Sequence, residues 1–342
     1  MSKKLNKFIM LLILGFILLF AFSTVSIAAE YLLKMTHGYY INSGMDLAQQ
    51  YIKEIVERKS EGRIEVQLFP YGRLGPEPVM LNKVRDGTVQ GATILTGTVS
   101  AVFPAGKPNK LRALDLPYLF SEREQIFKFL RSKEAEEAVE GLEPLGLIGV
   151  AMNSLEFMNL ATRTPVRKFT DLKKMKLRMQ QIEMMVDLFR KWGCPGVVIP
   201  FDEVYSSFQR GVADGYLNFW PGFRAMKIYE VLKYVTVLKP ICWYEIHVYN
   251  KSWWDKLPPD LQKLLWQTTK ESQLFATYAD AIDELETMEW IRKTKAMEII
   301  ELPPEEFVKF KKPIMKMHEE QEAAIGKDYL NRLYKLVDFK KE

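Results

Sequence analysis

Cysteine and histidine are scarce in this sequence, and their scarcity limits the chemistry that the chain can perform. Two cysteines, Cys194 and Cys242, and three histidines occur among 342 residues. Their spacing matches no zinc site, so we expect no metal. Two cysteines so far apart in sequence are more often separate buried thiols, which we expect here. A bridge between them is the alternative if the protein is exported.

The motifs of common cofactor-binding and hydrolytic enzymes are absent as well. The sequence contains no G-x-G-x-x-G, no P-loop, no G-x-S-x-G and no H-E-x-x-H. Nothing in it pairs His37, His247 or His318 with a nucleophile. The formal net charge is only +5, too small an excess of cations for a nucleic-acid-binding protein. We therefore predict no catalytic residue, no cofactor and no nucleic-acid partner.

Residues 1–28 have the composition of a secretory signal peptide. A lysine-rich start is followed by an almost unbroken apolar run, Phe8–Phe22, and by small residues at Ser26–Ala28. An uncleaved membrane anchor is the alternative, but the run of about 15 residues is shorter than the about 20 that a membrane span needs. No later apolar run is long enough either. We expect a periplasmic protein without direct membrane insertion once it is mature.

Helical and strand-like patterns alternate along the rest of the chain. They follow one another between residues 31 and 95 and again between residues 145 and 250. This alternation predicts α/β layers around a largely parallel sheet. From Pro259 to about Met297 no further proline and no glycine occurs. A continuous helix there would be roughly 58 Å long, so we expect it to be bent or to connect two domains.

Aromatic residues gather near predicted strand ends and loops. In open α/β sheets, ligands bind at the carboxyl ends of strands, and aromatic walls with few polar groups suit a small-molecule cleft. Ordinary core packing is the alternative for each of these residues. The candidates are Tyr39, Tyr40, Phe201, Trp220, Trp243 and Tyr244.

The stretch "KKMKLRMQQ", residues 173–181, places one arginine among three lysines. Leu177 and Met179 alternate with Lys176 and Arg178, as in a short half-buried strand. A solvated basic face explains the lysines. For Arg178 the pattern leaves two interpretations, a surface charge or a cation held inside the protein to bind an anion.

Three segments together resemble a known family. They are "SEGRIEVQLFPYGRLG" followed by "VMLNKVRDGTV", then "LDLPYLF", then residues 168–218 with "LRM" and "PFDEVYSSFQRGVADGYLN". Their order and spacing are similar to those of the periplasmic solute-binding proteins of TRAP transporters, the DctP type. The resemblance implies a two-lobed α/β fold of the periplasmic-binding-protein kind, with hinge strands and a long domain-spanning helix.

The resemblance also implies boundaries within the chain. Lobe I would comprise 29–152 plus about 242–285, and lobe II would comprise 153–241. The connecting helix would run over about 259–297, and C-terminal helices over 298–342. These ranges are expectations that follow from the family pattern and from the periodicities above.

The same resemblance suggests which residues bind the ligand. In the family, the arginine of "LRM" pairs with the substrate carboxylate, the asparagine after "DG-x-x" faces the ligand, and the phenylalanine of "PF-x-EVY" lines the cleft. Arg178, Asn218 and Phe201 match these positions. A guanidinium suits this task because its planar fork donates two parallel hydrogen bonds to a carboxylate.

Two departures from the family pattern affect the expected ligand. The aligned "NSLEFMNLAT" carries Phe157 and Met158 where many members have a second cleft arginine. The glutamate that some sugar-acid binders have near the end of "GATILT" is replaced by Leu95 or Thr96. We therefore favour a monocarboxylate with an apolar or aromatic body. Further contacts are expected from His37, Tyr39 and Tyr40 on the opposite lobe, and Phe157 and Thr96 are candidates for the same cleft.

The predicted function is capture of a small organic anion between two lobes that close by a hinge motion. The closed protein would then deliver the anion to the small and large membrane subunits of a TRAP permease. Two alternatives stay open at this point. One is an exported α/β enzyme acting on a small organic acid, and the other is a subunit that presents the ligand to a sensor.

Overall fold

Two β-sheets form the framework of the chain in the computed structural model, which describes residues 29–104 and 106–340. The signal peptide predicted for residues 1–28 lies outside the described residues. The first sheet contains, in spatial order, β2 (Ile64–Phe69), β1 (Tyr31–His37), β3 (Gly91–Leu95), β10 (Cys242–Asn250) and β4 (Leu147–Phe157). The second contains β11 (Glu298–Ile300), β9 (Tyr234–Thr236), β5 (Asn159–Thr162), β8 (Gly215–Asn218), β6 (Leu177–Met179) and β7 (Gly196–Val198).

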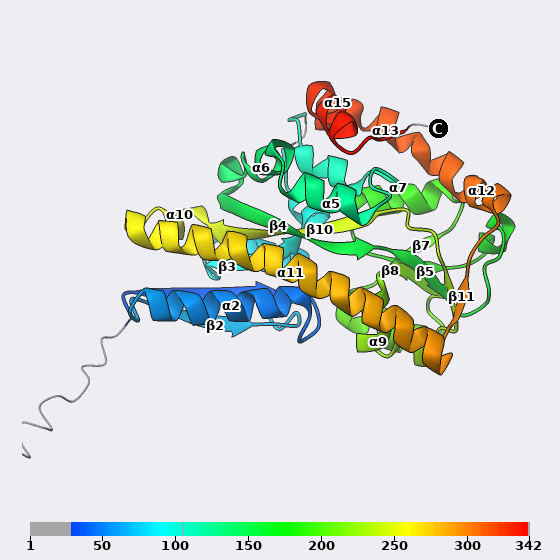
Figure 1. The fold of residues 1–342 in the computed structure, drawn as a ribbon, viewed down its shortest axis with the longest axis horizontal. Helices are drawn as coiled ribbons and strands as arrows, with labels where there is room; N and C mark the ends of the chain where they lie inside the picture. Colours follow the sequence, from blue (N-terminus) through cyan, green and yellow to red (C-terminus); the bar gives the residue numbers. More distant parts are fainter. Residues whose placement is uncertain (1–28, 105, 341–342) are drawn as a thin grey trace, which may run out of the picture.

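Helices cover these sheets, so the predicted two-lobed α/β fold is confirmed (Figure 1). The described helices are α2 (Gly44–Lys59), α3 (Glu77–Arg85), α4 (Thr96–Ser100), α5 (Arg123–Leu130), α6 (Lys133–Val139), α7 (Glu183–Lys191), α8 (Val204–Gln209), α9 (Trp220–Ala225), α10 (Lys251–Trp254), α11 (Pro259–Thr294), α12 (Pro304–Met315), α13 (Met317–Glu320), α14 (Glu322–Ile325) and α15 (Lys327–Leu336). Local signals set several of their ends. Ser43, for example, caps α2 by accepting a hydrogen bond from the Asp46 backbone.

The sheets are mixed, which corrects the expectation of a largely parallel sheet. Strand β1 runs parallel to β2 and β3, and β6 runs parallel to β7 and β8. Strand β10 is antiparallel to both β3 and β4, and β5 is antiparallel to both β8 and β9. The physical reason is connectivity. Strands β4, β5, β9 and β10 carry the chain between the sheets, so they enter each sheet without the crossover helix that a parallel neighbour requires.

Two adjacent segments carry the chain directly from a strand of one sheet to a strand of the other. Strand β4 leads into β5 through Met158, and residues 237–241 lead from β9 back to β10. Each crossing contains a non-glycine residue in the left-handed region, Glu156 with φ of 68° and Lys239 with φ of 49°. Such a conformation persists only where its surroundings hold it. The first sheet includes β4 as far as Phe157, whereas the sequence placed the lobe boundary after residue 152.

A single helix, α11, connects the two lobes along their length. It begins after α10, which follows the first sheet, and it leads into β11 of the second sheet. Pro259 starts the helix and Lys295, in the left-handed conformation, ends it. Figure 1 shows α11 running beside α2 and then beside α9, and it also packs against β4. The predicted long connecting helix is therefore present, three residues shorter at its end than about 297.

The C-terminal segment returns from the second lobe to the first. Residues 298–342 were expected to be helical, but Glu298–Ile300 instead form β11, because this short segment pairs in parallel with β9. Helix α12 then packs against α7, and α15 packs against α5 and α6 (Figure 1). The tail therefore adds another connection between the lobes.

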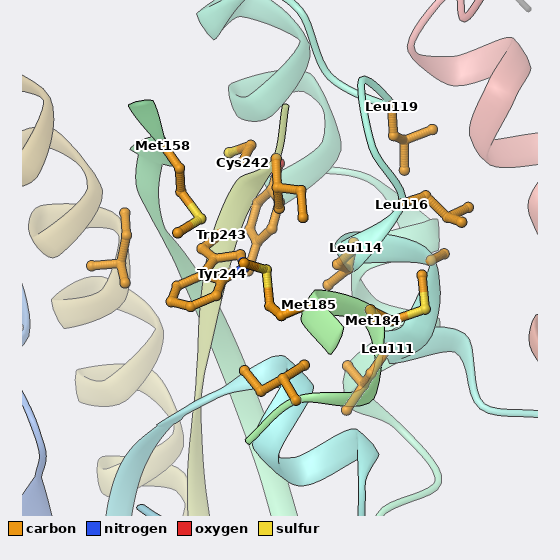
Figure 2. Close-up of a cluster of buried hydrophobic side chains, with 14 of the residues drawn as sticks. Leu111, Leu114, Leu116, Leu119, Met158, Met184, Met185, Cys242, Trp243 and Tyr244 are labelled. Atoms are coloured by element: carbon orange, nitrogen blue, oxygen red, sulfur yellow. The ribbon is translucent and has the colours of Figure 1, made fainter. Parts of the chain in front are cut away.

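Buried apolar side chains continue from one lobe to the other near the crossing segments. Figure 2 shows Trp243 and Tyr244 of β10 packed with Met184 and Met185 of α7, and with leucines of residues 110–119. Cys242 lies in the same cluster, and its Sγ is 3.3 Å from the Ser154 hydroxyl. Both Cys194 and Cys242 are free and buried, which confirms the expectation of separate thiols.

A charged cluster supports the first crossing segment. Arg123 of α5 donates from Nε to Glu156 at 3.1 Å and from Nη2 to Glu284 of α11 at 3.5 Å. Both carboxylates are almost fully buried, whereas the arginine side chain is one-third exposed. Arg123 therefore compensates two buried acids and links α5, β4 and α11 at the point where the lobes meet.

Replacing this arginine should destabilise the fold. We expect Arg123→Met to lower the free energy of unfolding by about 2–3 kcal/mol, because two buried carboxyl groups lose their guanidinium partner. The partial exposure of Arg123 keeps the loss below the roughly 3–5 kcal/mol typical of a fully buried pair. Urea unfolding measures the difference. Lys128→Met, an exposed position on the same helix, is the control and should change stability by less than about 0.5 kcal/mol. Equal stability of the two variants would contradict the assigned role.

Candidate functional site

Arg178 is buried inside the protein, so of the two interpretations that the sequence left open, the exposed surface charge is wrong. It is the central residue of β6, which lies between β7 and β8, and only 2% of its surface is exposed. The neighbouring Lys173, Lys174 and Lys176 are exposed, as expected. The Arg178 Nε donates to the Ile199 carbonyl at 2.9 Å. Its Nη1 has no hydrogen-bond partner among the described residues.

The buried guanidinium keeps its charge. Burial lowers the pKa of Arg178 to about 10, an effect that Tyr216 and Asp202 partly oppose. A group with this pKa is protonated at neutral pH. No ion pair to Arg178 occurs in the described part of the chain, so its positive charge is left without a partner carboxylate. Burying a cation in this way costs free energy unless an anion compensates it.

Arg178 lines a cavity of about 320 Å³ between the two lobes. Asn218, at the carboxyl end of β8, lines it too, and its Nδ2 donates to the Tyr216 hydroxyl while Oδ1 has no described partner. Arg178 pairs with Tyr216 across the parallel strands β6 and β8, and Asn218 ends β8 two residues after Tyr216. Arg178 and Asn218 therefore both lie near the carboxyl ends of these strands. This is the position at which α/β sheets present groups to ligands.

Aromatic rings from both lobes enclose the cavity. Tyr39, in the loop after β1, has its ring centroid 5.1 Å from that of Phe201 and 5.2 Å from that of Phe219. Trp243 of β10 lines the cavity as well, and its Nε1 has no described partner. The predicted residues Tyr39, Phe201 and Trp243 are therefore brought together with Arg178 and Asn218. The contact between Tyr39 and Phe201 also means that the two lobes touch beside the cavity.

Besides the exposed Asp202, two acidic residues that the sequence analysis did not identify line the cavity. Glu77 lies at the start of α3, and Glu245 lies in the middle of β10. Glu77 accepts hydrogen bonds from the Thr98 hydroxyl at 2.8 Å and from the Leu95 backbone at 3.3 Å. Glu245 accepts one from Asn153 Nδ2 at 3.1 Å. The available signal was a lone acid within the otherwise uncharged buried run "CWYEIHVY".

Three predicted site residues on the first lobe support the cavity from outside. His37 is fully buried, and its Nδ1 accepts a hydrogen bond from the Tyr39 backbone while Nε2 contacts Asp46 at 3.1 Å. Tyr40 donates to Asp283 of α11 at 2.9 Å. Thr96 donates to the Tyr244 carbonyl at 3.1 Å. None of the three lines the cavity, where Leu95 and Thr98 are found instead of Thr96.

Three other predicted residues lie in the core. Tyr244 packs against Phe120 and Phe129, because its side chain points to the opposite face of β10 from those of Trp243 and Glu245, which line the cavity. Phe157 is buried under the Lys239 ammonium. Trp220 packs on Phe223 in the core of the second lobe, because α9 begins at this residue. These three residues were expected to contact the ligand directly, but they lie outside the cavity lining.

The composition of the lining limits the chemistry of the site. Among the described lining residues, Arg178 is the one cation, and most of the others are apolar or aromatic. No group of three or more His, Cys, Asp or Glu in residues 29–104 and 106–340 could hold a metal ion. No helix in that part of the chain has the length and apolar character needed to cross a membrane. The arrangement suits reversible binding of a small anion.

Comparisons with known proteins agree on one family. Residues 42–324 match the model of the bacterial extracellular solute-binding proteins, family 7, called DctP. The chain is 24% identical over 306 residues to the C4-dicarboxylate-binding periplasmic protein DctP of Rhodobacter capsulatus, covering 90% of this chain and 91% of that protein.

Solved structures show the same fold. The sugar acid binding protein DctPAm of Advenella mimigardefordensis, in complex with galactonate, superposes with a TM-score of 0.84 at 23% identity, covering 91% of this chain and 99% of that one. A TRAP periplasmic solute-binding protein of Shewanella oneidensis with bound succinate also gives 0.84, at 21% identity, covering 90% and 99%.

The buried acids predict how stability depends on pH. Burial raises the pKa of Glu77 and Asp115 to about 7 and that of Asp280 to about 8, and it also raises the pKa of Glu245. The folded protein therefore holds protons that the unfolded chain has lost above pH 4.5. Each of these groups favours the folded state below its unfolded pKa, so stability should fall as the pH rises from about 5 to about 8.

Urea unfolding at a series of pH values tests this. Asp280→Asn removes one of the titrating groups and keeps the hydrogen bond from the Gly44 backbone, so its curve should be flatter than that of the wild type. A stability that rises over the same pH range in the empty protein would contradict the assignment of these carboxyls as protonated.

Proposed function

Because this chain belongs to the DctP family of bacterial extracellular solute-binding proteins, which serve TRAP transporters, we propose that it captures one small organic acid between its lobes and delivers it to membrane permease subunits. The observation that carries the proposal is the buried, unpaired guanidinium of Arg178 beside a cavity of about 320 Å³. A cavity of this size is at the lower end of the range for small-molecule sites. Succinate, galactonate and C4-dicarboxylates, named for the similar proteins, share a carboxylate.

Arg178 is the anchor for that carboxylate. Its Nε is engaged by Ile199, so Nη1 is free to donate to one carboxylate oxygen. Asn218, which lines the same cavity, can present its amide to the other end of the headgroup. Hydrogen bonds to charged groups contribute about 1.5–3 kcal/mol each, so loss of the guanidinium should reduce affinity by two orders of magnitude or more.

The rest of the lining favours one carboxylate and an apolar or aromatic body. Tyr39, Phe201 and Trp243 offer ring faces, and Met45, Met80 and Leu155 add apolar surface. A second carboxylate would meet no second cation among the described lining residues, and it would lie near Glu77 and Glu245. In this respect the proposed ligand differs from the dicarboxylates named for similar proteins.

Binding would favour the closed arrangement of the lobes. Arg178, Asn218 and Phe201 belong to the second lobe, whereas Tyr39 and Trp243 belong to the first. A ligand that contacts both sets binds the closed form more tightly than an open one, and it shifts the equilibrium by that difference in affinity. Delivery to a permease also requires export, for which the signal peptide over residues 1–28 remains a prediction. A ligand-presenting role toward a sensor would use the same closure.

The central test replaces the anchor and its exposed neighbour. Arg178→Met should weaken binding of carboxylates at least 100-fold, while the empty variant should be as stable as the wild type, because an uncompensated buried charge is removed. Lys176→Met is the matched control, since Lys176 is exposed two residues away, and it should bind as the wild type does.

A thermal-shift screen of succinate, galactonate, hexanoate and 3-phenylpropanoate, followed by calorimetry, gives the affinities. Mass spectrometry of the recovered compound distinguishes binding from turnover. Wild-type affinity in Arg178→Met would contradict the role of Arg178 as the carboxylate anchor. Chemical conversion of the compound would favour an enzyme. Preference for succinate would contradict the proposal of a single carboxylate.

A further inference from the structure

The wall of the cavity that faces Arg178 is acidic. Glu77 and Glu245 come from α3 and β10 of the first lobe, whereas Arg178 comes from β6 of the second. Glu245 is 1% exposed, and Glu77 is half-buried. The cavity therefore brings one buried cation and two carboxyl groups to a common space from opposite lobes. Asp202, an exposed acid on the second lobe, also lines it near Arg178.

These carboxyl groups lack a cationic partner in the described part of the chain. Glu245 forms no ion pair there, and neither does Glu77; their hydrogen bonds come from Asn153, Thr98 and the Leu95 backbone. A third buried acid, Asp280 of α11, acts on Glu245 and has an Oδ2 without a described partner. Three acids thus share one region without compensation, an arrangement that costs free energy while they are ionised.

The cavity also has unused donors that are themselves buried. Besides Arg178 Nη1, the Trp243 Nε1 and the Tyr39 hydroxyl have no described hydrogen-bond partner, although Trp243 is 3% and Tyr39 5% exposed. Unpaired polar atoms at this depth are rare in folded proteins unless a ligand engages them. All three atoms belong to residues that line the cavity, which supports a ligand site there independently of the acids.

We infer, on the basis of the function proposed above, that the ligand is a zwitterion. This ligand carries a carboxylate for Arg178 and a cationic nitrogen that faces Glu77 and Glu245. The nitrogen supplies the positive charge that the acidic wall lacks, and the carboxylate supplies the negative charge that Arg178 lacks. Each lobe is then compensated by the opposite end of one small molecule. An ammonium group would donate hydrogen bonds to the carboxylates, and a quaternary nitrogen would also meet the faces of Tyr39 and Trp243.

A hydroxyl-rich sugar acid is the competing occupant, because hydroxyl groups also donate to carboxylates. It agrees less well with the lining, where Met45, Met80, Leu95, Leu155 and Ile182 offer no hydrogen bonds. Thr98, Gln180, Gln181 and Asn218 could pair with some hydroxyls of such an acid, and each hydroxyl that instead lay against these apolar groups without a partner would cost about 1–3 kcal/mol. One compact cation needs only the two carboxylates.

The affinity for a zwitterion should depend on pH. The groups that face Glu245 are Asp280 of α11, Glu77 of α3, Asn153 of β4, and Tyr39 and Tyr40 of the loop after β1. All the ionisable ones are acids or phenols, and burial raises the pKa of Glu245 further. Burial also raises the pKa of Glu77 to about 7, and a cationic ligand binds the deprotonated form of this carboxyl, so the affinity of such a ligand should rise between pH 5.5 and 8. A neutral-bodied monocarboxylate is repelled by that form, so its affinity should fall.

Matched pairs of acids test the inference by calorimetry. The probes are ω-trimethylammonio alkanoates with two to five methylene groups, each compared with its tert-butyl isostere, for example 4-(trimethylammonio)butanoate with 5,5-dimethylhexanoate. The two members of a pair have the same shape and differ only in the charge. At pH 8 the best zwitterion should bind at least tenfold tighter than its isostere, and at pH 5.5 the ratio should be below threefold.

Two variants connect the preference to the acidic wall. Glu245→Gln should reduce the zwitterion-to-isostere ratio at least fivefold, and Glu77→Gln provides a second reading should Glu245→Gln not fold. Glu65→Gln, on an exposed position of β2 in the same sheet, is the matched control and should leave the ratio unchanged. Retention of the full ratio in both cavity variants would overturn the role of the acids.

The outcomes separate this inference from the proposed function. If the isosteres bind as tightly as the zwitterions, the ligand is an uncharged-bodied carboxylate, and only the zwitterion inference fails. Tighter binding of galactonate than of every zwitterion would likewise overturn it in favour of hydroxyl donors. If no carboxylate of either series or of the earlier screen binds, the proposed function fails and the inference fails with it.

Discussion

The fold is organised around a buried positive charge for which the described chain provides no partner. Arg178 lies in β6 between β7 and β8 and lines the space between the lobes, and its Nη1 has no described hydrogen-bond partner. An arginine cannot escape this cost by losing its proton, as a buried lysine can. The charge is therefore available for an anion from outside, and the specificity of the site begins with that requirement.

The two lobes bring a guanidinium and acidic side chains to the same space. The second lobe offers the guanidinium and the Asn218 amide, and the first offers Glu77, Glu245 and two aromatic residues. In an open arrangement each set would be solvated by water, and closure removes that water from both. A molecule that supplies both missing charges compensates both desolvation costs at once, which gives closure a chemical condition as well as a steric one.

Sequence patterns predicted the features that depend on local periodicity or on a family motif. The alternation around Arg178 indicated a half-buried strand, and the absence of helix breakers indicated α11. Features that depend on which distant strands meet were not predictable in this way. Glu245 reaches the cavity only because β10 inserts between β3 and β4, which come from much earlier in the chain. Trp220 was misplaced because Pro221, which suits the first turn of a helix, was not used as the signal that α9 begins here, and the indole packs in the core.

The continuous helix α11 has a mechanical consequence. It packs against α2 and β4 of one lobe and against α9 of the other, and its backbone hydrogen bonds run unbroken between them. Any rotation of the lobes about the crossing strands must therefore bend this helix or slide one lobe along it. Because bending a continuous helix costs free energy, α11 would oppose such a rotation in proportion to the bend that the rotation imposes on it.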